Sequence, residues 1–194
     1  MVNSTVIIGD QGVILIDSGA SDEVGNHLGT AIAKLTTKPV THVINTHHHG
    51  DHVLGNIAFA QAEIISSEIC RDMVKQTGDE WVALMESLIG HKLPNTKPVP
   101  ASVTHAGENA RVEQTVQGVR MVFWIPKGSH TVGDMMVYLP EDKVLVGGDI
   151  LVNRDVRAIG DRLEGVVLER GRPRPDLFAL VVFDPRGDHP DVLD

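Results

Sequence analysis

The sequence of 194 residues has one cysteine, a shortage of cationic side chains and no long apolar run. With Cys70 alone, no disulfide can form within the chain, which is compatible with a reducing compartment. Its 17 basic and 26 acidic residues give a net charge of -9. Because a sequence-independent nucleic-acid binder needs a basic surface, we expect no nucleic-acid partner. Apolar runs fall short of the roughly 20 residues that span a bilayer, so we expect no membrane partner either.

The first residues lack the three parts of a secretory signal, which are a basic start, a long apolar stretch and a small-residue cleavage site. We therefore expect a cytoplasmic protein, or a periplasmic one if a segment upstream of this sequence is missing. Hydrophobic residues make up 42% of the chain, enough for a buried core. The length suits one domain, so a single domain over residues 1–194 is predicted.

The first half of the sequence alternates between strand and helix patterns. "TVIIG" and "VILID" are short β-branched runs joined by a turn signal, which predicts a hairpin. From Ser21 to Leu35, apolar residues recur at helical spacing. "VTHVINT" then reads as another strand. This order predicts an α/β arrangement.

Later segments continue the pattern up to about residue 152. Residues 67–90 predict a helix whose apolar face is broken near Gly78, and four short strand-like runs follow near 110–116, 119–125, 134–139 and 143–147. Residues 153–194 diverge from this regularity because they are rich in Arg, Asp, Gly and Pro. A further helix is expected there, around 160–170.

The densest group of metal-seeking side chains is "NTHHHGDH", residues 45–52. In an extended segment, residues two apart point to the same side, so His47 and His49 can face one point. Asp51 continues that register, and His52 turns toward a neighbouring point if a helix begins there. Imidazole and carboxylate groups suit zinc and related cations. A surface histidine run is the alternative, but this run is internal and follows a strand.

Two ligands for each of two metals are too few, because zinc usually has four ligands, or three and a water. "WIPKGSHTVGD" places His130, and "KVLVGGD" places Asp149, at strand-to-loop junctions like that of the cluster. Either residue alone would be interpreted as a turn residue. Together with H-x-H-x-D-H, they predict a metal site.

"THHHGDH", "GSHTVGDMMVYLPEDKVLVGGD" and "LIDSG" together resemble the metallo-β-lactamase superfamily of metal-dependent hydrolases, over about residues 4 to 152. The resemblance implies a four-layer αββα sandwich of two mixed β-sheets with outer helices, and metals along one edge. It implies the following ligands: His47, His49 and His130 for the first metal, Asp51 and His52 for the second, and Asp149 bridging both. His48 falls at a variable position. Asp17 matches an aspartate behind the site, which either orients a ligand or caps a strand.

The sequence departs from the family pattern at both ends. The family has a further histidine near its C-terminus, and here only His189 lies in that region, in "VVFDPRGDHPD". It is either a ligand of the second metal or a solvent-exposed tail residue. The first alternative predicts two Zn²⁺ ions per chain, and the second predicts one. The family's sandwich also begins with strands before "TVIIG". Their loss would expose a sheet edge and favour a homodimer.

The resemblance implies a zinc-dependent hydrolase that uses a metal-bound hydroxide on a small-molecule substrate. The bond cleaved is an ester, thioester, lactone or amide/β-lactam bond, with Asp51 and Asp149 orienting the nucleophile and assisting proton transfer. The best-known dizinc β-lactamases carry a cysteine where Asp149 stands, so efficient β-lactam turnover is less favoured than a related hydrolysis. The alternative is a non-catalytic or weakly active metal-binding relative that serves as a binding or assembly protein.

Overall fold

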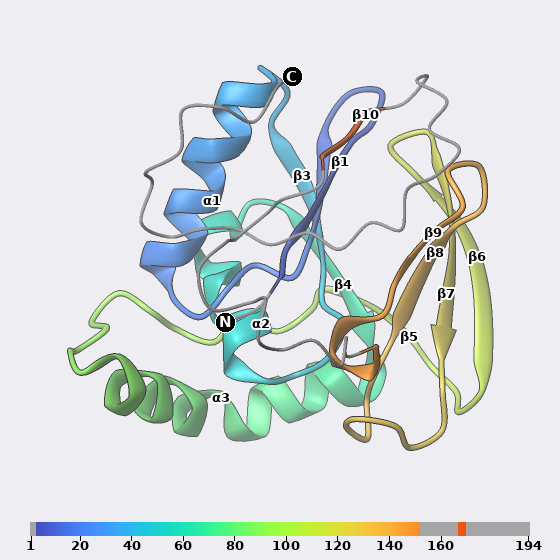
Figure 1. Ribbon diagram of the computed structural model, residues 1–194. Coiled ribbons are helices and arrows are strands. Elements are labelled where there is room, and N and C mark those ends of the chain that lie inside the picture. Colours follow the sequence, from blue (N-terminus) through green and yellow to red (C-terminus); the bar gives the residue numbers. More distant parts are fainter. Residues whose placement is uncertain (1–2, 152–166, 170–194) are drawn as a thin grey trace.

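The computed structural model of the chain describes residues 3–151 and 167–169. Helices, a six-stranded sheet and a four-stranded sheet form three successive layers, seen from left to right in Figure 1. The expected α/β sandwich of two sheets is therefore confirmed. In the described part of the chain, no helix is both long enough and apolar enough to span a membrane.

The six-stranded sheet is mixed, because β1 and β2 pair antiparallel and the other neighbours pair parallel. Its spatial order is β10 (Val167–Glu169), β1 (Thr5–Ile8), β2 (Val13–Ile16), β3 (Val40–Ile44), β4 (Glu63–Ser67) and β5 (Val103–His105). The four-stranded sheet contains β6 (Ala110–Val116), β7 (Val119–Ile125), β8 (Met136–Leu139) and β9 (Val144–Val146). These four strands pair antiparallel throughout, whereas a second mixed sheet was expected.

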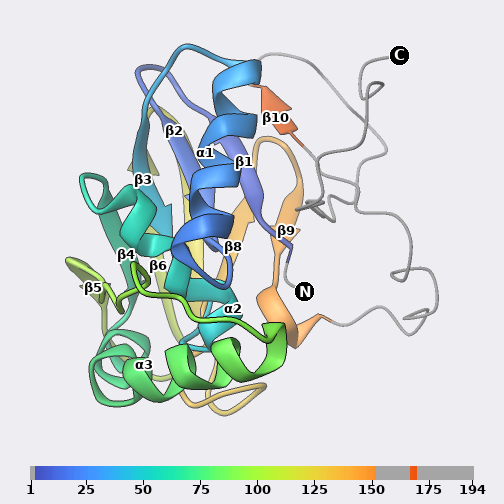
Figure 2. The ribbon, with the colours of Figure 1, turned by 90° about the vertical axis from the view of Figure 1, so that its left-hand side faces the viewer.

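Strand β10 bears on two expectations, the helix around 160–170 and the exposed sheet edge. The helix predicted around 160–170 is wrong for residues 167–169, which pair parallel with β1 (Figure 2). Backbone pairing with β1 outweighs the local helical pattern there. Since β1 lies between β10 and β2, it is not the exposed edge from which a homodimer was inferred. The homodimer stays a prediction.

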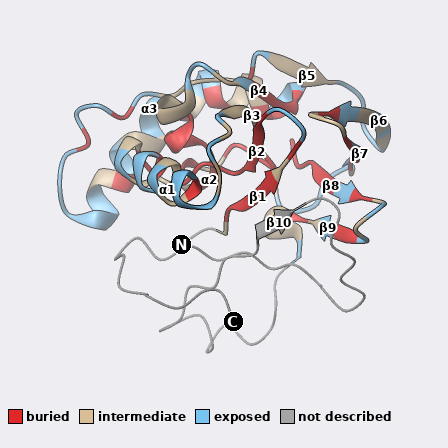
Figure 3. Cartoon of the chain, turned by 90° about the horizontal axis from the view of Figure 1, so that it is seen from above, coloured by how far each residue is buried: buried red, intermediate tan, exposed pale blue. Residues whose placement is uncertain are grey.

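Strand β2 is buried on both faces, which explains its continuous apolar sequence "VILI". Ile14 and Ile16 belong to the core between the two sheets, whereas Val13 and Leu15 belong to the cluster under the helices. Figure 3 shows β2 coloured as buried, with helices α1 and α3 on one side and the four-stranded sheet on the other. Burying each such side chain stabilises the fold by about 1.5–3 kcal/mol. The strand is therefore held firmly at the place where it delivers the chain to the edge of the sandwich.

Helix α1 (Asp22–Leu35) begins where the Ser21 hydroxyl accepts a hydrogen bond from the backbone N–H of Val24. Its buried residues Leu28 and Ile32 pack in the same cluster as β2 residues of the six-stranded sheet. Two short segments follow β3, namely α2 (Gly50–Val53) and the 3-10 helix η1 (Leu54–Phe59). These short segments place the end of the histidine cluster against the sheet.

Helix α3 (Glu68–Ile89) confirms the predicted helix, but its buried face includes Val74, Gly78 and Met85, so the predicted break in the apolar face at Gly78 is wrong. A Cβ atom at Gly78 would lie 2.5 Å from side-chain carbons of Pro98. The glycine therefore permits close packing of the helix against the following loop, and helical hydrogen bonding continues through it. The helix ends at Gly90, whose φ of 80° is the left-handed conformation that glycine adopts readily.

The outer face of the four-stranded sheet has no helix over it among the described residues. Trp124, Tyr138 and Leu145 are exposed on this face. The outer helical layer expected on this side is therefore not found among the described residues.

Candidate metal centre

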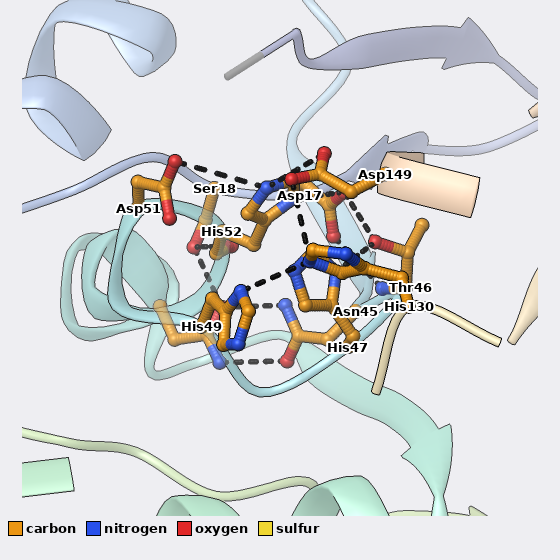
Figure 4. Close-up of polar contacts among 11 residues, drawn as sticks. Asp17, Ser18, Asn45, Thr46, His47, His49, Asp51, His52, His130 and Asp149 are labelled. Atoms are coloured by element: carbon orange, nitrogen blue, oxygen red, sulfur yellow. Dashed lines mark hydrogen bonds and ion pairs between the residues drawn. The ribbon is translucent and has the colours of Figure 1, made fainter. Parts of the chain in front are cut away.

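The side chains predicted from the sequence meet at one edge of the sandwich (Figure 4). Asp17 follows β2, and the cluster beginning at His47 follows β3. His130 lies in the loop between β7 and β8, and Asp149 lies in the 3-10 helix η2 (Gly148–Ile150) after β9. Both sheets therefore contribute residues to one site.

Four of these residues form a compact group with the donor atoms of a metal site. The ligand atoms of His47, His49, His130 and Asp149 all lie within 4.8 Å of one another. Within the group, His130 Nε2 is 3.2 Å from His49 Nδ1 and 3.6 Å from Asp149 Oδ2. Three imidazoles and a carboxylate form a donor set that suits a divalent zinc ion.

A second group adjoins the first through Asp149. His52 Nε2 is 3.3 Å from Asp149 Oδ1 and 3.8 Å from Asp51 Oδ2. One oxygen of Asp149 thus lies near His130 and the other near His52, as a carboxylate between two metals would. The roles of these residues as ligands remain predictions. His189, the remaining predicted ligand, lies outside the described residues.

A buried nitrogen atom supports the fit to a cation. His47 is about 1% exposed, and the structure gives its Nε2 atom no hydrogen-bond partner among the described residues. An unsatisfied buried polar atom costs about 1–3 kcal/mol. A divalent cation at this edge would provide the missing partner for the lone pair of His47 Nε2, so the residues present fit a metal.

Asp17 makes contacts that suit both functions that the sequence left open. Its Oδ2 lies 2.8 Å from His52 Nδ1, which orients that ring. Its Oδ1 accepts a hydrogen bond from the backbone N–H of Thr46 at 2.8 Å, which caps the end of β3. The carboxylate can only accept, so His52 Nδ1 carries a hydrogen and Nε2 is the atom available to a metal. Asp17 itself adopts a φ of 59°, which is uncommon for a residue other than glycine.

His48 lies outside the group of four candidate ligands. It is buried, and its ring centroid is 5.0 Å from that of His49 and 6.4 Å from that of Trp81. Trp81, from helix α3, also packs against the His49 ring at 4.8 Å. The alternation of the extended segment thus separates His48 from its two neighbours.

Burial and neighbouring charges shift the pKa values of the site in different directions. Burial, with the charges of His52 and His49, lowers the pKa of His47 to about 2. The interaction with His52 lowers the pKa of Asp149 to about 2. Burial lowers the pKa of His52, but the Asp17 and Asp149 carboxylates outweigh it and raise that pKa to about 10. At neutral pH, His47 is therefore neutral and Asp149 ionised, the forms that bind metal, whereas His52 must release a proton.

A buried amide pair beneath the site was not anticipated from the sequence. The side-chain amides of Asn45 and Asn56 donate to each other's oxygens at 3.1 and 2.9 Å. The Ser18 hydroxyl donates to Asn56 Oδ1 at 2.7 Å. These bonds join the segments that carry Asp17 and His47. No local sequence motif predicts the role of Asn56, because its hydrogen-bond partners come from other elements.

A second unanticipated residue, Asp134, organises the loop around His130. Its Oδ2 accepts hydrogen bonds from the Ser129 hydroxyl and from the Thr131 backbone N–H, both at 2.7 Å. Its Oδ1 accepts from the Thr131 hydroxyl, also at 2.7 Å. The two residues flanking His130 are therefore bound to one buried carboxylate. The repeated pattern of hydroxyl residues before an aspartate is the only sequence signal for it.

Family membership follows from a comparison with protein-family models. The model described as "Metallo-beta-lactamase superfamily" matches residues 1–189. The chain belongs to the metallo-beta-lactamase superfamily. The resemblance inferred from the histidine cluster, "LIDSG" and the segment ending in "GGD" is thereby confirmed.

Curated superfamily members similar to the chain differ in their named activities. A linear primary-alkylsulfatase from Pseudomonas sp. (strain ATCC 19151) is 22% identical over 167 residues, covering 72% of this chain and 31% of that protein. A metallo-beta-lactamase type 2 from Bacillus sp. (strain 170) is 26% identical over 170 residues, covering 86% of this chain and 57% of that protein. The chain thus spans about a third to just over half of the length of these relatives.

Solved superfamily structures show the same fold. A metallo-beta-lactamase from Pontibacter korlensis superposes with a TM-score of 0.57 at 24% identity, covering 80% of this chain and 63% of that one. The stereoselective inverting sec-alkylsulfatase Pisa1 from Pseudomonas sp. gives a TM-score of 0.54 at 22% identity, covering 74% and 27%. The superfamily sandwich is therefore present in this chain.

Proposed function

We propose that this chain is a zinc-dependent hydrolase that acts on small molecules. The observation that carries the proposal is the convergence of His47, His49, His130 and Asp149, whose ligand atoms lie within 4.8 Å of one another. Family membership adds support, since lactamases and alkylsulfatases of this superfamily are hydrolases. We propose two zinc ions per chain, or one if His189 is not a ligand.

A bound divalent cation would lower the pKa of a coordinated water molecule and polarise the bond to be cleaved. His47, His49 and His130 would hold the first ion. Asp51 and His52 would hold the second, with Asp149 shared. The raised pKa of His52 means that a proton must leave its Nε2 before that atom can serve as a ligand.

The carboxylates Asp51 and Asp149 lie on the solvent-accessible side of the site. The Asp149 side chain is 42% exposed and that of Asp51 is 32% exposed, whereas that of His52 is 2% exposed. A substrate and the attacking water would therefore approach past Asp51 and Asp149. An ionised carboxylate in that position can accept the proton of the attacking water and orient the nucleophile. We assign these roles to Asp51 and Asp149.

We propose an ester, thioester, lactone or amide/β-lactam bond as the bond that is cleaved. The relation to alkylsulfatases adds sulfate esters as a second candidate class. The aspartate at position 149, where the best-known dizinc β-lactamases have cysteine, favours the non-lactam bonds within this set.

A substrate panel on zinc-loaded protein tests the proposal. Hydrolysis of at least one class is expected, with its loss in His47→Ala and in Asp149→Asn. His91→Ala is a matched control, because that exposed histidine pairs with Glu23 away from the ligand group. Zinc per chain is counted by elemental analysis alongside. Zero or one zinc with no turnover on any ester, thioester, lactone, lactam or sulfate ester would favour a non-catalytic binding protein.

A further inference from the structure

Within the part of the chain that the structure describes, Thr46 lies in or contacts each segment that carries a predicted ligand. It is 2% exposed and stands between the end of β3 and His47. Its backbone N–H and its hydroxyl donate to the two oxygens of Asp17 at 2.8 and 2.7 Å. Its carbonyl oxygen accepts from the backbone N–H of Met135 at 2.7 Å, just after the loop that carries His130. Thr46 thus joins the six-stranded sheet to the four-stranded sheet at this edge.

The segment that carries Asp149 packs closely against the Thr46 side chain. Gly148, which precedes Asp149, has a φ of +52°. A Cβ atom built at Gly148 would lie 2.6 Å from Thr46 Oγ1 and 2.8 Å from Thr46 Cβ. Only a glycine lets the backbone approach this closely. The position of Asp149 is therefore set in part by the side chain of Thr46.

The hydroxyl of Thr46 also determines which nitrogen of His47 carries a hydrogen. A threonine hydroxyl has one hydrogen, and Thr46 donates it to Asp17 Oδ2. Its other contact, 3.1 Å from His47 Nδ1, must then be one in which the hydroxyl accepts. His47 Nδ1 therefore carries the hydrogen, and Nε2 keeps its lone pair. This Nε2 is the buried atom without a hydrogen-bond partner among the described residues.

Asp17 determines in the same way which nitrogen of His52 carries a hydrogen. Its Oδ2 accepts from Thr46 and also lies 2.8 Å from His52 Nδ1. A single oxygen atom thus contacts His52 directly and His47 through Thr46. The two histidines belong to different predicted metal centres, so the pair Thr46–Asp17 lies between those centres.

We propose that Thr46 is a positioning residue that fixes the hydrogen-bearing nitrogen of His47 and, through Asp17, links the two metal centres. The inference rests on the proposed metal site but not on any substrate. Its readouts are zinc affinity and imidazole nitrogen spectra. A protein that binds zinc yet hydrolyses nothing would contradict the proposed hydrolase and leave this role intact.

The substitutions Thr46→Val and Thr46→Ser separate the hydroxyl from the methyl group. Valine keeps the branched shape against Gly148 and lacks the hydroxyl, whereas serine keeps the hydroxyl. Zinc affinity, measured by chelator competition, is expected to fall about 10- to 100-fold in Thr46→Val, the range found for outer-shell partners of metal ligands. Thr46→Ser should stay near the wild-type affinity. Unchanged affinity in Thr46→Val, or equal weakening in both variants, would overturn the proposal.

A measurement on the unsubstituted protein keeps the test decisive if Thr46→Val fails to fold. In the zinc-free protein, ¹⁵N spectra of the His47 imidazole should show the hydrogen on Nδ1. A hydrogen on Nε2 instead would overturn the proposal without any variant. Thr46→Ser should give the same spectrum as the wild type, because its hydroxyl can make both contacts.

Discussion

His52 and Asp149 face each other across the site, with Nε2 of the histidine 3.3 Å from Oδ1 of the carboxylate. The first atom comes from the short helix α2 after β3 of the six-stranded sheet, and the second comes from the 3-10 helix η2 after β9 of the four-stranded sheet. In the metal-free protein, the carboxylates around His52 raise its pKa to about 10. A proton and a bound metal ion would therefore compete for the same nitrogen atom.

Zinc binding should release a proton from His52. At about pH 8, unperturbed imidazoles are neutral, but His52 remains protonated in the metal-free protein because of its raised pKa. One released proton raises the apparent affinity by up to about tenfold per pH unit below the pKa of about 10. Calorimetry in buffers of different ionisation enthalpy measures the release. His52→Gln should release about one proton fewer, and identical heats in all buffers would contradict the prediction.

The same shift predicts how His52 affects the stability of the zinc-free fold. Its pKa is higher in the folded state than the ordinary value of 6.5, so the folded state binds the proton more tightly than the unfolded state does. The stabilisation is fully present below pH 6.5 and is lost as the pH rises through about 10. His52→Gln should therefore lower the free energy of unfolding more at the acidic end of this window. Urea unfolding at several pH values provides the measurement, and an equal loss at both ends would count against it.

Gly148→Ala should displace Asp149 and weaken zinc binding. The added Cβ would lie 2.6 Å from the Thr46 hydroxyl, in addition to the strain of a φ of +52°. Gly128→Ala is the control, because Gly128 has a φ of +57° and nothing within 4 Å of the added atom. Both variants bear a left-handed strain of about 1–2 kcal/mol. Only Gly148→Ala should also lose zinc affinity, and equal affinities in the two variants would refute the close approach.

Gly78→Ala should destabilise the protein although the position lies inside a helix. Alanine in a helix interior is normally about 1 kcal/mol more favourable than glycine. At Gly78, however, the new Cβ would lie 2.5 Å from Pro98. At Gly29 in α1, the nearest atom would be a Phe59 ring carbon at an ordinary 3.6 Å, so Gly29→Ala should stabilise. Thermal unfolding of the two variants should shift in opposite directions, and a stabilised Gly78→Ala would contradict the packing.

Asp17→Asn should reduce both stability and zinc binding. Asp17 accepts from the Thr46 N–H and hydroxyl and lies against His52 Nδ1. An amide NH₂ facing one of these donors leaves a buried group unsatisfied, at about 1–3 kcal/mol. Asp79→Asn, on the exposed side of α3, is a charge-matched control. Urea unfolding and zinc stoichiometry measure both effects, and two bound zinc ions at unchanged stability in Asp17→Asn would be inconsistent with this role.

The fold and most of the site could be predicted because their signals are local. The alternation of the extended segment separates His47 and His49 from His48, and strand ends place His130 and Asp149 at one edge. Thr46 and Asn56 could not be assigned a role, because their partners come from segments distant in the sequence. The predicted break in the apolar face at Gly78 has the same origin. Glycine adds no apolar side chain to a helical face, but this glycine is buried against Pro98, 20 positions later in the printed sequence.

The division of the ligand group between the two sheets has a mechanical consequence. His47 and His49 extend from one sheet, whereas His130 and Asp149 extend from the other. A cation bound to all four would therefore be a cross-link between the halves of the sandwich. Separating the sheets would require breaking coordination bonds in addition to removing the apolar contacts between them. Metal loading should then slow amide hydrogen exchange at β3 and β8 together, so that the two layers open as one unit.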